Sequence, residues 1–369
     1  MLALSFLFIV SASLPFAIYF LGNVALTYCA GRLISSGGVR KRRIFSFTLA
    51  WLIGNLCFFK YFNTISAGLS TIGAKLSLFP QFHPPVILLP LGMSYLVFRL
   101  SHYLFELYRG NIPKSNFVDF ALYALFFPTF LAGPVERFQR FYPQSRQTGI
   151  FSLAECNYGL FRIALGIIKK FIIADNLANL IMPVFQSPDG YSRAAVILAV
   201  YGLALRIYLD FSGYTDMAIG VSRLFGYRIM ENFNKPFLQK NIALFWRHWH
   251  ISVYSWIRDY FFFPLFGFKA SILKLYLGIF LTMVVFHLWH AASIGFLVMG
   301  IYHGTGLILW QLFRESKKKL PVFAKLMSYK ILDPVSVFLT FSFVSFGFIF
   351  FEFKFYQSLS IIKRLLINA

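Results

Sequence analysis

Three of the seven histidines lie within one stretch that carries no charged side chain. His287, His290 and His303 fall inside residues 275–313, which contain no Lys, Arg, Asp or Glu. An ionisable group in so apolar a segment is costly and usually faces a cavity or a partner. Burial keeps an imidazole neutral, and a neutral imidazole can take a proton from an attacking hydroxyl group. We therefore interpret these histidines either as candidate general bases or as structural histidines hydrogen-bonded between helices.

A metal site is the weaker interpretation of these residues. His287 and His290 are three residues apart and would share a helix face. A zinc site would need further Cys, His or carboxylate ligands, and no carboxylate lies nearby in the sequence. The cysteines, Cys29, Cys57 and Cys156, form no CxxC pair. We predict neither a metal site nor a disulfide framework.

A second polar region spans residues 206–260. It holds seven basic residues, four acidic residues and two histidines in 55 positions. Charges within a membrane protein usually face a cavity or one another, so this interval is predicted to be a polar loop or the lining of a funnel. The candidate positioning groups are the side chains of Asp210, Asp216, Arg247, His248, His250, Arg258 and Asp259. Arg258 and Asp259 are adjacent, and on an α-helix we expect their side chains to diverge.

The elements that must position these groups belong to a chain with the composition of an integral membrane protein. Hydrophobic residues make up 58% of the 369 positions and charged residues 13%, against about 25% charged in soluble domains. The net charge of +22 comes partly from basic runs beside apolar stretches, at 40–43 and 317–319. That arrangement favours cytoplasmic loops and anionic lipid head groups. We expect membrane lipid as a partner and no nucleic acid.

The apolar segments predict an all-α, multi-pass protein with about ten transmembrane or re-entrant helices, each about 20 residues long when it spans the bilayer. These segments are residues 1–31, 44–59, 84–98, 117–131, 158–168, 171–185, 194–209, 275–313 and 334–351. Residues 275–313 are long enough for two spans, with a turn near Ala291–Gly295. The prolines in 84–98 predict a broken or re-entrant segment, and 117–131 is a further apolar stretch with an internal proline. Without a repeat or linker, residues 1–369 are predicted to form one domain.

Two strings resemble the signature regions of the bacterial membrane-bound O-acyltransferase (MBOAT) family. They read FWRHWHISVYSWIRDYFFFPL at 245–265 and HLWHAASIGFLVMGIYHG at 287–304. Six further strings agree in the same order, at 58–63, 89–98, 108–110, 126–138, 169–178 and 209–227. The resemblance covers nearly the whole chain. It is greatest to the alginate O-acetyltransferase branch, which includes peptidoglycan O-acetyltransferases, and the D-alanyl transfer branch of teichoic acid is more distant.

The resemblance implies a helical fold around a central tunnel or funnel in the bacterial inner membrane. His290 matches the essential histidine of the family, on a catalytic hairpin over 275–313, and His250 matches a second important histidine in a partly re-entrant segment, 206–260. Supporting roles are expected for Trp289, Trp249, Asp210, Asp216, Arg247, Arg258, Asp259 and His303. Relatives usually have glycine at the position of Ala291, whose methyl group would narrow the site or alter a helix contact.

The implied activity is O-acyl transfer, with acetyl the expected group. The acyl group would come from a cytoplasmic thioester, either acetyl-CoA or an acyl carrier protein, and no permanently bound cofactor is expected. The acceptor would be a hydroxyl of a cell-surface polysaccharide or peptidoglycan, reached directly or through a periplasmic SGNH-type transferase. No glycine-rich phosphate loop marks the donor pocket, so the cofactor-binding residues stay unassigned.

Two other functions remain open from the sequence. One is D-alanyl transfer of the teichoic-acid type. The other is a membrane transporter that uses its intramembrane histidines as proton relays. Inverted repeats would favour a transporter, and none is evident in the sequence.

Overall fold

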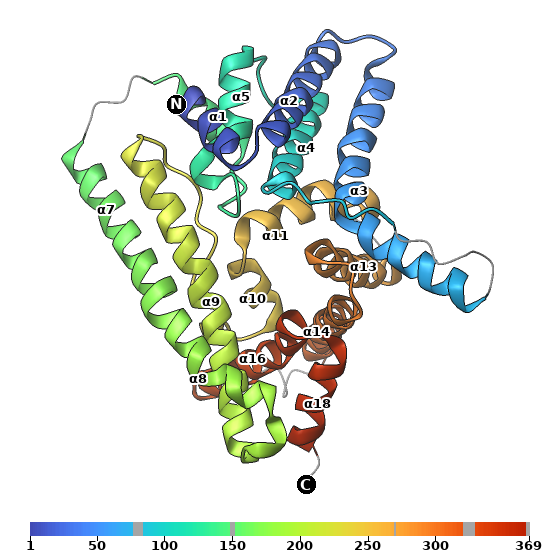
Figure 1. Ribbon diagram of the computed structural model, residues 1–369, viewed down its shortest axis with the longest axis vertical. Coiled ribbons are helices and arrows are strands. Elements are labelled where there is room, and N and C mark those ends of the chain that lie inside the picture. Colours follow the sequence, from blue (N-terminus) through green and yellow to red (C-terminus); the bar gives the residue numbers. More distant parts are fainter. Residues whose placement is uncertain (77–83, 148–151, 269–270, 320–328, 367–369) are drawn as a thin grey trace. The chain divides into compact units, whose positions relative to one another are not determined.

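The computed structural model describes residues 1–76, 84–147, 152–268, 271–319 and 329–366, which form helices and connecting loops with no β-strand among them (Figure 1). The all-α prediction is confirmed for these residues. Helices suit a chain of this composition, because a helix satisfies its own backbone hydrogen bonds where lipid offers no partner.

The contacts within the chain divide it into two compact units. The first comprises residues 1–161 and 218–230, and the second comprises residues 162–217 and 231–369. Two long elements pass from one unit into the other, α7 (Leu153–Ile167) and α9 (Arg193–Leu224). The division does not test the prediction of one domain over 1–369, which stays a prediction.

The first unit holds α1 (Leu2–Ala12), α2 (Leu14–Ser35), α3 (Lys41–Lys75), α4 (Met93–Arg109), α5 (Phe117–Leu125) and α6 (Phe138–Ser145). The segment predicted as a single first span is broken at Ser13. The Ser13 backbone is extended, and its hydroxyl accepts a hydrogen bond from the Phe16 N–H. Pro15 lies in the first turn of α2, where a missing N–H costs nothing.

The two proline-containing segments of the first unit are both interrupted, and the sequence predicted this for 84–98. Residues 84–90 are not helical, and α4 begins only after Gly92, whose φ is 83°. Helix α5 ends at Leu125, before Pro128. The fully buried Arg99 guanidinium donates to the carbonyl oxygens of Ala124 and Thr129, at 3.1 and 2.7 Å. It therefore satisfies carbonyl groups that the helix break would leave without a donor.

The second unit carries most of the candidate residues. Its elements are α8 (Asp175–Gln186), α10 (Ile242–His248), α11 (Ile251–Ile257), α12 (Phe263–Phe266), α13 (Ile272–His290), α14 (Ile294–Lys319), α16 (Asp333–Gly347), α17 (Ile349–Glu352) and α18 (Phe355–Leu366). Helix α7 runs through a π-helix, Ile168–Ala174, directly into α8, and a second π-helix, Arg258–Phe262, links α11 to α12. The polar interval 206–260 begins inside α9, which ends at Leu224. It continues through α10 and α11 into the second π-helix.

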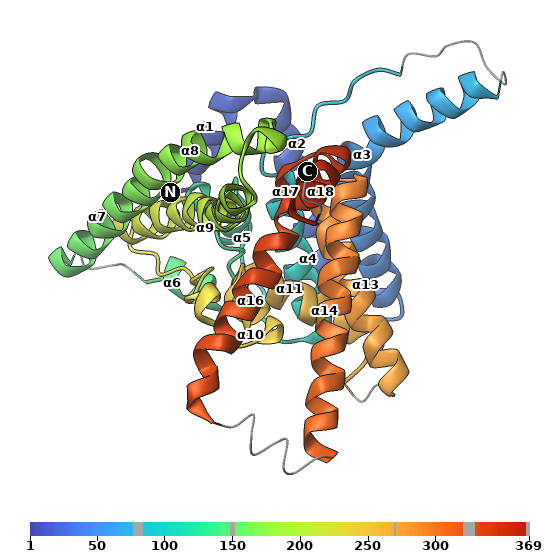
Figure 2. The same ribbon diagram turned by 90° about the horizontal axis from the view of Figure 1, so that it is seen from below.

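The predicted hairpin of two helices over 275–313 is confirmed by α13 and α14, which pack side by side with a turn at 291–293 (Figure 2). Glycines allow this close approach. A Cβ added at Gly300 would lie 2.8 Å from the Val284 Cα, and one added at Gly304 would lie 3.1 Å from the Phe280 ring. Small residues at a helix contact let two backbones approach closely within a membrane.

Six helices among the described residues are long and apolar enough to cross a membrane, at Leu14–Ser35, Lys41–Lys75, Arg193–Leu224, Ile272–His290, Ile294–Lys319 and Lys330–Glu352. Two shorter apolar helical segments accompany them, at Leu2–Ala12 and Phe117–Thr129. The chain is thus a multi-pass membrane protein. The prediction of about ten segments is not confirmed by this count.

Candidate active site

His290 is the last residue of α13, and aromatic rings from three helices surround it. Its ring stacks on Phe296 of α14 at 5.8 Å between centroids. The edges of Phe286 and of Phe351, on α17, pack against it at 5.4 and 5.5 Å. The imidazole is only half-buried, which leaves part of it accessible. A wall of this kind lowers the local dielectric around an accessible base.

The position after His290 does not require a glycine. Ala291 has φ −159° and ψ 150°, an extended backbone that any residue adopts. The difference from the usual family motif therefore adds no backbone strain here.

His250 lies at the junction of α10 and α11 and has a left-handed backbone, with φ 45° and ψ 50°. Such a conformation is uncommon outside glycine and often marks a functional position. The His250 Nδ1 is 3.4 Å from the Asn232 Oδ1, which also accepts hydrogen bonds from the Ser252 N–H and hydroxyl. His250 lies outside the six candidate spans, and burial lowers its pKa to about 3. The imidazole is therefore neutral at pH 7, with Nδ1 as its donor to Asn232.

Trp289 brings the two predicted histidines into one neighbourhood. Its ring centroid lies 4.6 Å from that of His290 and 6.5 Å from that of His250. Trp249 is buried and packs against Phe348 at 5.2 Å, which in turn packs against Phe351 of the His290 wall at 6.2 Å. The structure thus joins four of the predicted residues, His290, Trp289, His250 and Trp249, through aromatic contacts.

His303 belongs to a different cluster. Its ring is parallel to that of His287, with centroids 5.3 Å apart, and the Trp246 indole packs edge-on against both rings. The His287 Nδ1 donates to the Met283 carbonyl oxygen at 2.7 Å, which leaves Nε2 as the acceptor nitrogen. Both histidines are buried. Their burial and mutual packing fit a structural role better than contact with a substrate.

The predicted carboxylates Asp210 and Asp216 are held by cations of the α7–α8 segment. Asp216 pairs with Arg162 at 2.5 Å and with Lys169 at 2.6 Å, and Asp210 pairs with Lys170 at 2.5 Å. The π-helix of residues 168–174 carries both lysines, and π-helices occur often at functional sites. These pairs join α9 to the preceding helices.

The expected divergence of Arg258 and Asp259 is wrong. The Arg258 Nε donates to the Asp259 Oδ1 at 2.8 Å. Both residues lie in the π-helix of residues 258–262 rather than in an α-helix. Its wider turn reduces the angle between successive side chains, and the long arginine stem can fold back onto its neighbour. Arg247, on α10, is exposed.

Several residues at the site were not predicted. Asn232 is fully buried and connects His250 to Ser252, but the sequence NFN around it has no recognisable motif. The chain has 48 phenylalanines, and nothing in the sequence distinguishes Phe286, Phe296 and Phe351 from the others. Only the three-dimensional contacts select them.

No group of three or more His, Cys, Asp or Glu residues suited to a metal ion occurs among the described residues. The aromatic wall around His290 offers no set of oxygen, nitrogen or sulfur ligands of the kind that metal ions prefer.

The comparisons with known proteins agree with the sequence motifs. The model of the MBOAT, membrane-bound O-acyltransferase family, matches residues 39–351. The chain is 35% identical over 316 residues to a probable alginate O-acetylase, AlgI, of Pseudomonas aeruginosa, a match that covers 84% of this chain and 60% of the relative. It is 29% identical over 291 residues to a peptidoglycan O-acetyltransferase of Helicobacter pylori, covering 72% of this chain and 54% of that protein.

A teichoic acid D-alanyltransferase of Bacillus subtilis is also similar, at 32% identity over 287 residues, which cover 75% of this chain and 72% of that protein. The match to the Pseudomonas aeruginosa alginate O-acetylase extends further along this chain. The chain spans about three fifths of the length of the alginate O-acetylases that it matches.

Proposed function

Because the chain belongs to the membrane-bound O-acyltransferase family, we propose that it transfers an acyl group from a thioester donor to a hydroxyl of a cell-surface polysaccharide or peptidoglycan. The observation that carries this proposal is the half-exposed His290, set in an aromatic wall at the end of α13. The names of the alginate and peptidoglycan relatives favour acetyl as the group transferred.

In the proposed reaction, His290 is the general base. Its imidazole takes the proton of the acceptor hydroxyl while the hydroxyl oxygen attacks the thioester carbonyl carbon. The tetrahedral intermediate then collapses, the carbon–sulfur bond breaks, and the thiolate receives the proton from the imidazolium. The products are an O-ester and a free thiol. His250 and Trp289 act as positioning residues in this scheme, because Trp289 contacts both histidine rings.

The surroundings of the reaction are part of the same proposal. The donor is acetyl-CoA or an acyl carrier protein on the cytoplasmic side of the bacterial inner membrane, and no cofactor is permanently held. A central tunnel within a single domain of about ten membrane segments would bring the acyl group to the acceptor. The acceptor side includes a periplasmic SGNH-type transferase, to which the chain passes the acyl group if it does not acylate the polysaccharide itself.

The proposal is tested with the purified chain in proteoliposomes. Labelled acetyl-CoA is supplied on one side and an oligosaccharide acceptor on the other, with D-alanyl-loaded carrier protein as a parallel donor. We expect alkali-labile label in the acceptor, from acetyl-CoA more than from the D-alanyl carrier. Product formed by the chain alone excludes an obligatory second transferase. Solute or proton flux without any ester product, even after an SGNH-type partner is added, would favour the transporter alternative and contradict the proposal.

A His250→Asn variant is expected to lower the rate of acyl transfer by up to about 100-fold, the cost of misplacing a reacting group by about 1 Å. Asparagine tolerates the left-handed backbone at this position, so the variant should fold, with a lower unfolding temperature because the smaller side chain loses buried packing. The rates and unfolding temperatures of both proteins would be measured in the same detergent.

The matched control is His248→Ala, two residues earlier. The His248 Nδ1 bonds only to the Leu244 carbonyl of its own helix among the contacts described, at 2.8 Å, so this variant should keep the wild-type rate. Equal rates for His250→Asn and wild type would remove His250 from the site.

A further inference from the structure

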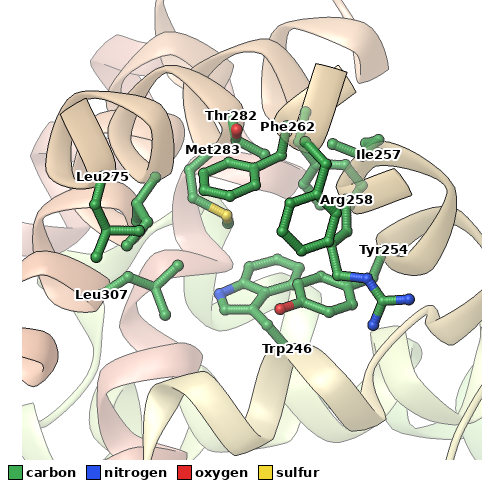
Figure 3. Close-up of a pocket in the computed structure, with 12 residues that line it drawn as sticks. Trp246, Tyr254, Ile257, Arg258, Phe262, Leu275, Thr282, Met283 and Leu307 are labelled. Carbon is green, nitrogen blue, oxygen red and sulfur yellow. The ribbon is translucent and has the colours of Figure 1, made fainter. Parts of the chain in front are cut away.

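An apolar pocket of about 220 Å³ adjoins the wall of His290. Helix α13 lines it with Ile279 and Phe286. Met283 of α13, Leu307 of α14 and Trp246 of α10 line it as well (Figure 3). Phe286 is shared between the pocket and the candidate active site, because the edge of its ring packs against His290 at 5.4 Å. What occupies the pocket therefore supports one wall of His290.

The size and lining of the pocket select a hydrocarbon occupant. An apolar protein cavity of about 150 Å³ stays dry and holds a molecule as large as benzene. A pocket of about 220 Å³ is thus far larger than an acetyl group requires and has room for several methylene groups. Acyl transfer as proposed above leaves this space unexplained.

Apolar side chains are also exposed where the chain enters α13. Phe268, between α12 and α13, is 83% exposed, and Leu273, in the first turn of α13, is 79% exposed. Helices α13 and α14 are both candidate membrane spans. Side chains of this kind face bilayer hydrocarbon favourably, whereas water-soluble thioester donors would meet an unfavourable apolar surface.

One basic side chain of the pocket fits an anionic head group. Arg258, in the π-helix of residues 258–262, lines the pocket, and its side chain is 48% exposed despite its pairing with Asp259. In Figure 3 the Arg258 guanidinium group lies at the edge of the pocket and not among its apolar side chains. A basic side chain with its apolar stem in the pocket and its charged group at the edge can attract the phosphate of an anionic lipid.

We propose that this pocket binds one alkyl chain of an anionic phospholipid from the surrounding bilayer, with the lipid phosphate near Arg258. The bound chain packs against Phe286 and so holds the wall of His290 in place. This lipid site is separate from the acyl donor and acceptor, and its occupancy can be measured without any acyl transfer.

The test uses the full chain in vesicles that contain phosphatidylglycerol with a photoreactive diazirine at the end of one alkyl chain. We expect crosslinks on α13 and α14, at residues near Ile279 and Leu307. Filling the pocket with Leu307→Trp should weaken this crosslinking at least about fivefold, because overpacking costs enough to displace a ligand chain. Leu309→Trp is the matched control, since Leu309 is exposed on the same helix and should crosslink as the wild type does.

Two further variants and a second lipid probe test the pocket and the head-group contact separately. Ile279→Phe is a second filling variant, for use if Leu307→Trp does not insert correctly. A phosphatidylcholine probe should label less than phosphatidylglycerol, and Arg258→Gln should remove that difference. Equal labelling of the wild type and both filling variants would overturn the proposal. Protection of the pocket from labelling by a long-chain acyl thioester, but not by unlabelled phosphatidylglycerol, would also overturn it and assign the pocket to the donor.

Discussion

Replacement of His290 by alanine is expected to lower the rate of O-acyl transfer by roughly 10²–10⁴-fold, the usual contribution of a positioned general base. The acceptor hydroxyl would have to attack without a group to take its proton. The fold should tolerate the change, because His290 is only half-buried at the end of α13 and its backbone needs no special conformation. The rate would be measured in proteoliposomes, and the unfolding temperature in detergent.

Two measurements distinguish loss of the catalytic base from loss of folded, membrane-inserted protein. The unfolding temperature of His290→Ala should stay near that of the wild type, and membrane insertion should be unchanged. His248→Ala removes another imidazole from the same unit and should keep full activity, because the His248 ring bonds back to its own helix. Surface O-acylation at the wild-type level by a correctly inserted His290→Ala protein would refute the catalytic assignment.

The hairpin that carries His290 could be predicted from the sequence because it depends on local properties. Residues 275–313 have no charge, are long enough for two spans, and contain an Ala-Ala-Ser turn after His290. The break between α1 and α2 was equally local. Ser13 followed by Pro15 is a helix-start signal, and the prediction of a single first span overlooked it.

The aromatic wall around His290 could not be predicted in this way. Phe351 lies 61 positions further along the chain, and no periodicity connects it to α13. Asn232 likewise reaches His250 only through the irregular chain between α9 and α10. Contacts of this kind depend on how the helices pack, which a single sequence does not encode in any local pattern.

The number of membrane spans could not be predicted from local patterns either. Helix α4 has 17 residues and α5 has nine, so both are shorter than a bilayer requires when they are straight. Mean hydropathy identifies the segment that contains α5 as apolar but does not distinguish a buried core helix from a spanning one.

Replacement of Asp216 distinguishes a role in the reaction from a role in folding stability. The family motif suggested a supporting role in the site, whereas the structure places the carboxylate between Arg162 and Lys169, with only 7% of its side chain exposed. Replacement by asparagine keeps the shape and removes the charge, so that Lys169 loses its carboxylate partner. Breaking a buried ion pair in this manner typically costs about 3–5 kcal/mol. We expect a loss of folding stability near the lower end of that range, since Arg162 keeps its pairing with Glu231.

Asp210→Asn is the matched control for this prediction. Asp210 lies on the same helix and pairs with the neighbouring Lys170, but its side chain is 40% exposed. Exposed pairs contribute only about 0–1 kcal/mol, so this variant should unfold almost as the wild type does. Chemical unfolding curves of both variants would be compared, together with the transfer rate per folded molecule. A normal rate in the destabilised Asp216→Asn protein would identify the ion pairs as a brace between α7 and α9, whereas a stable but inactive variant would place Asp216 in the reaction.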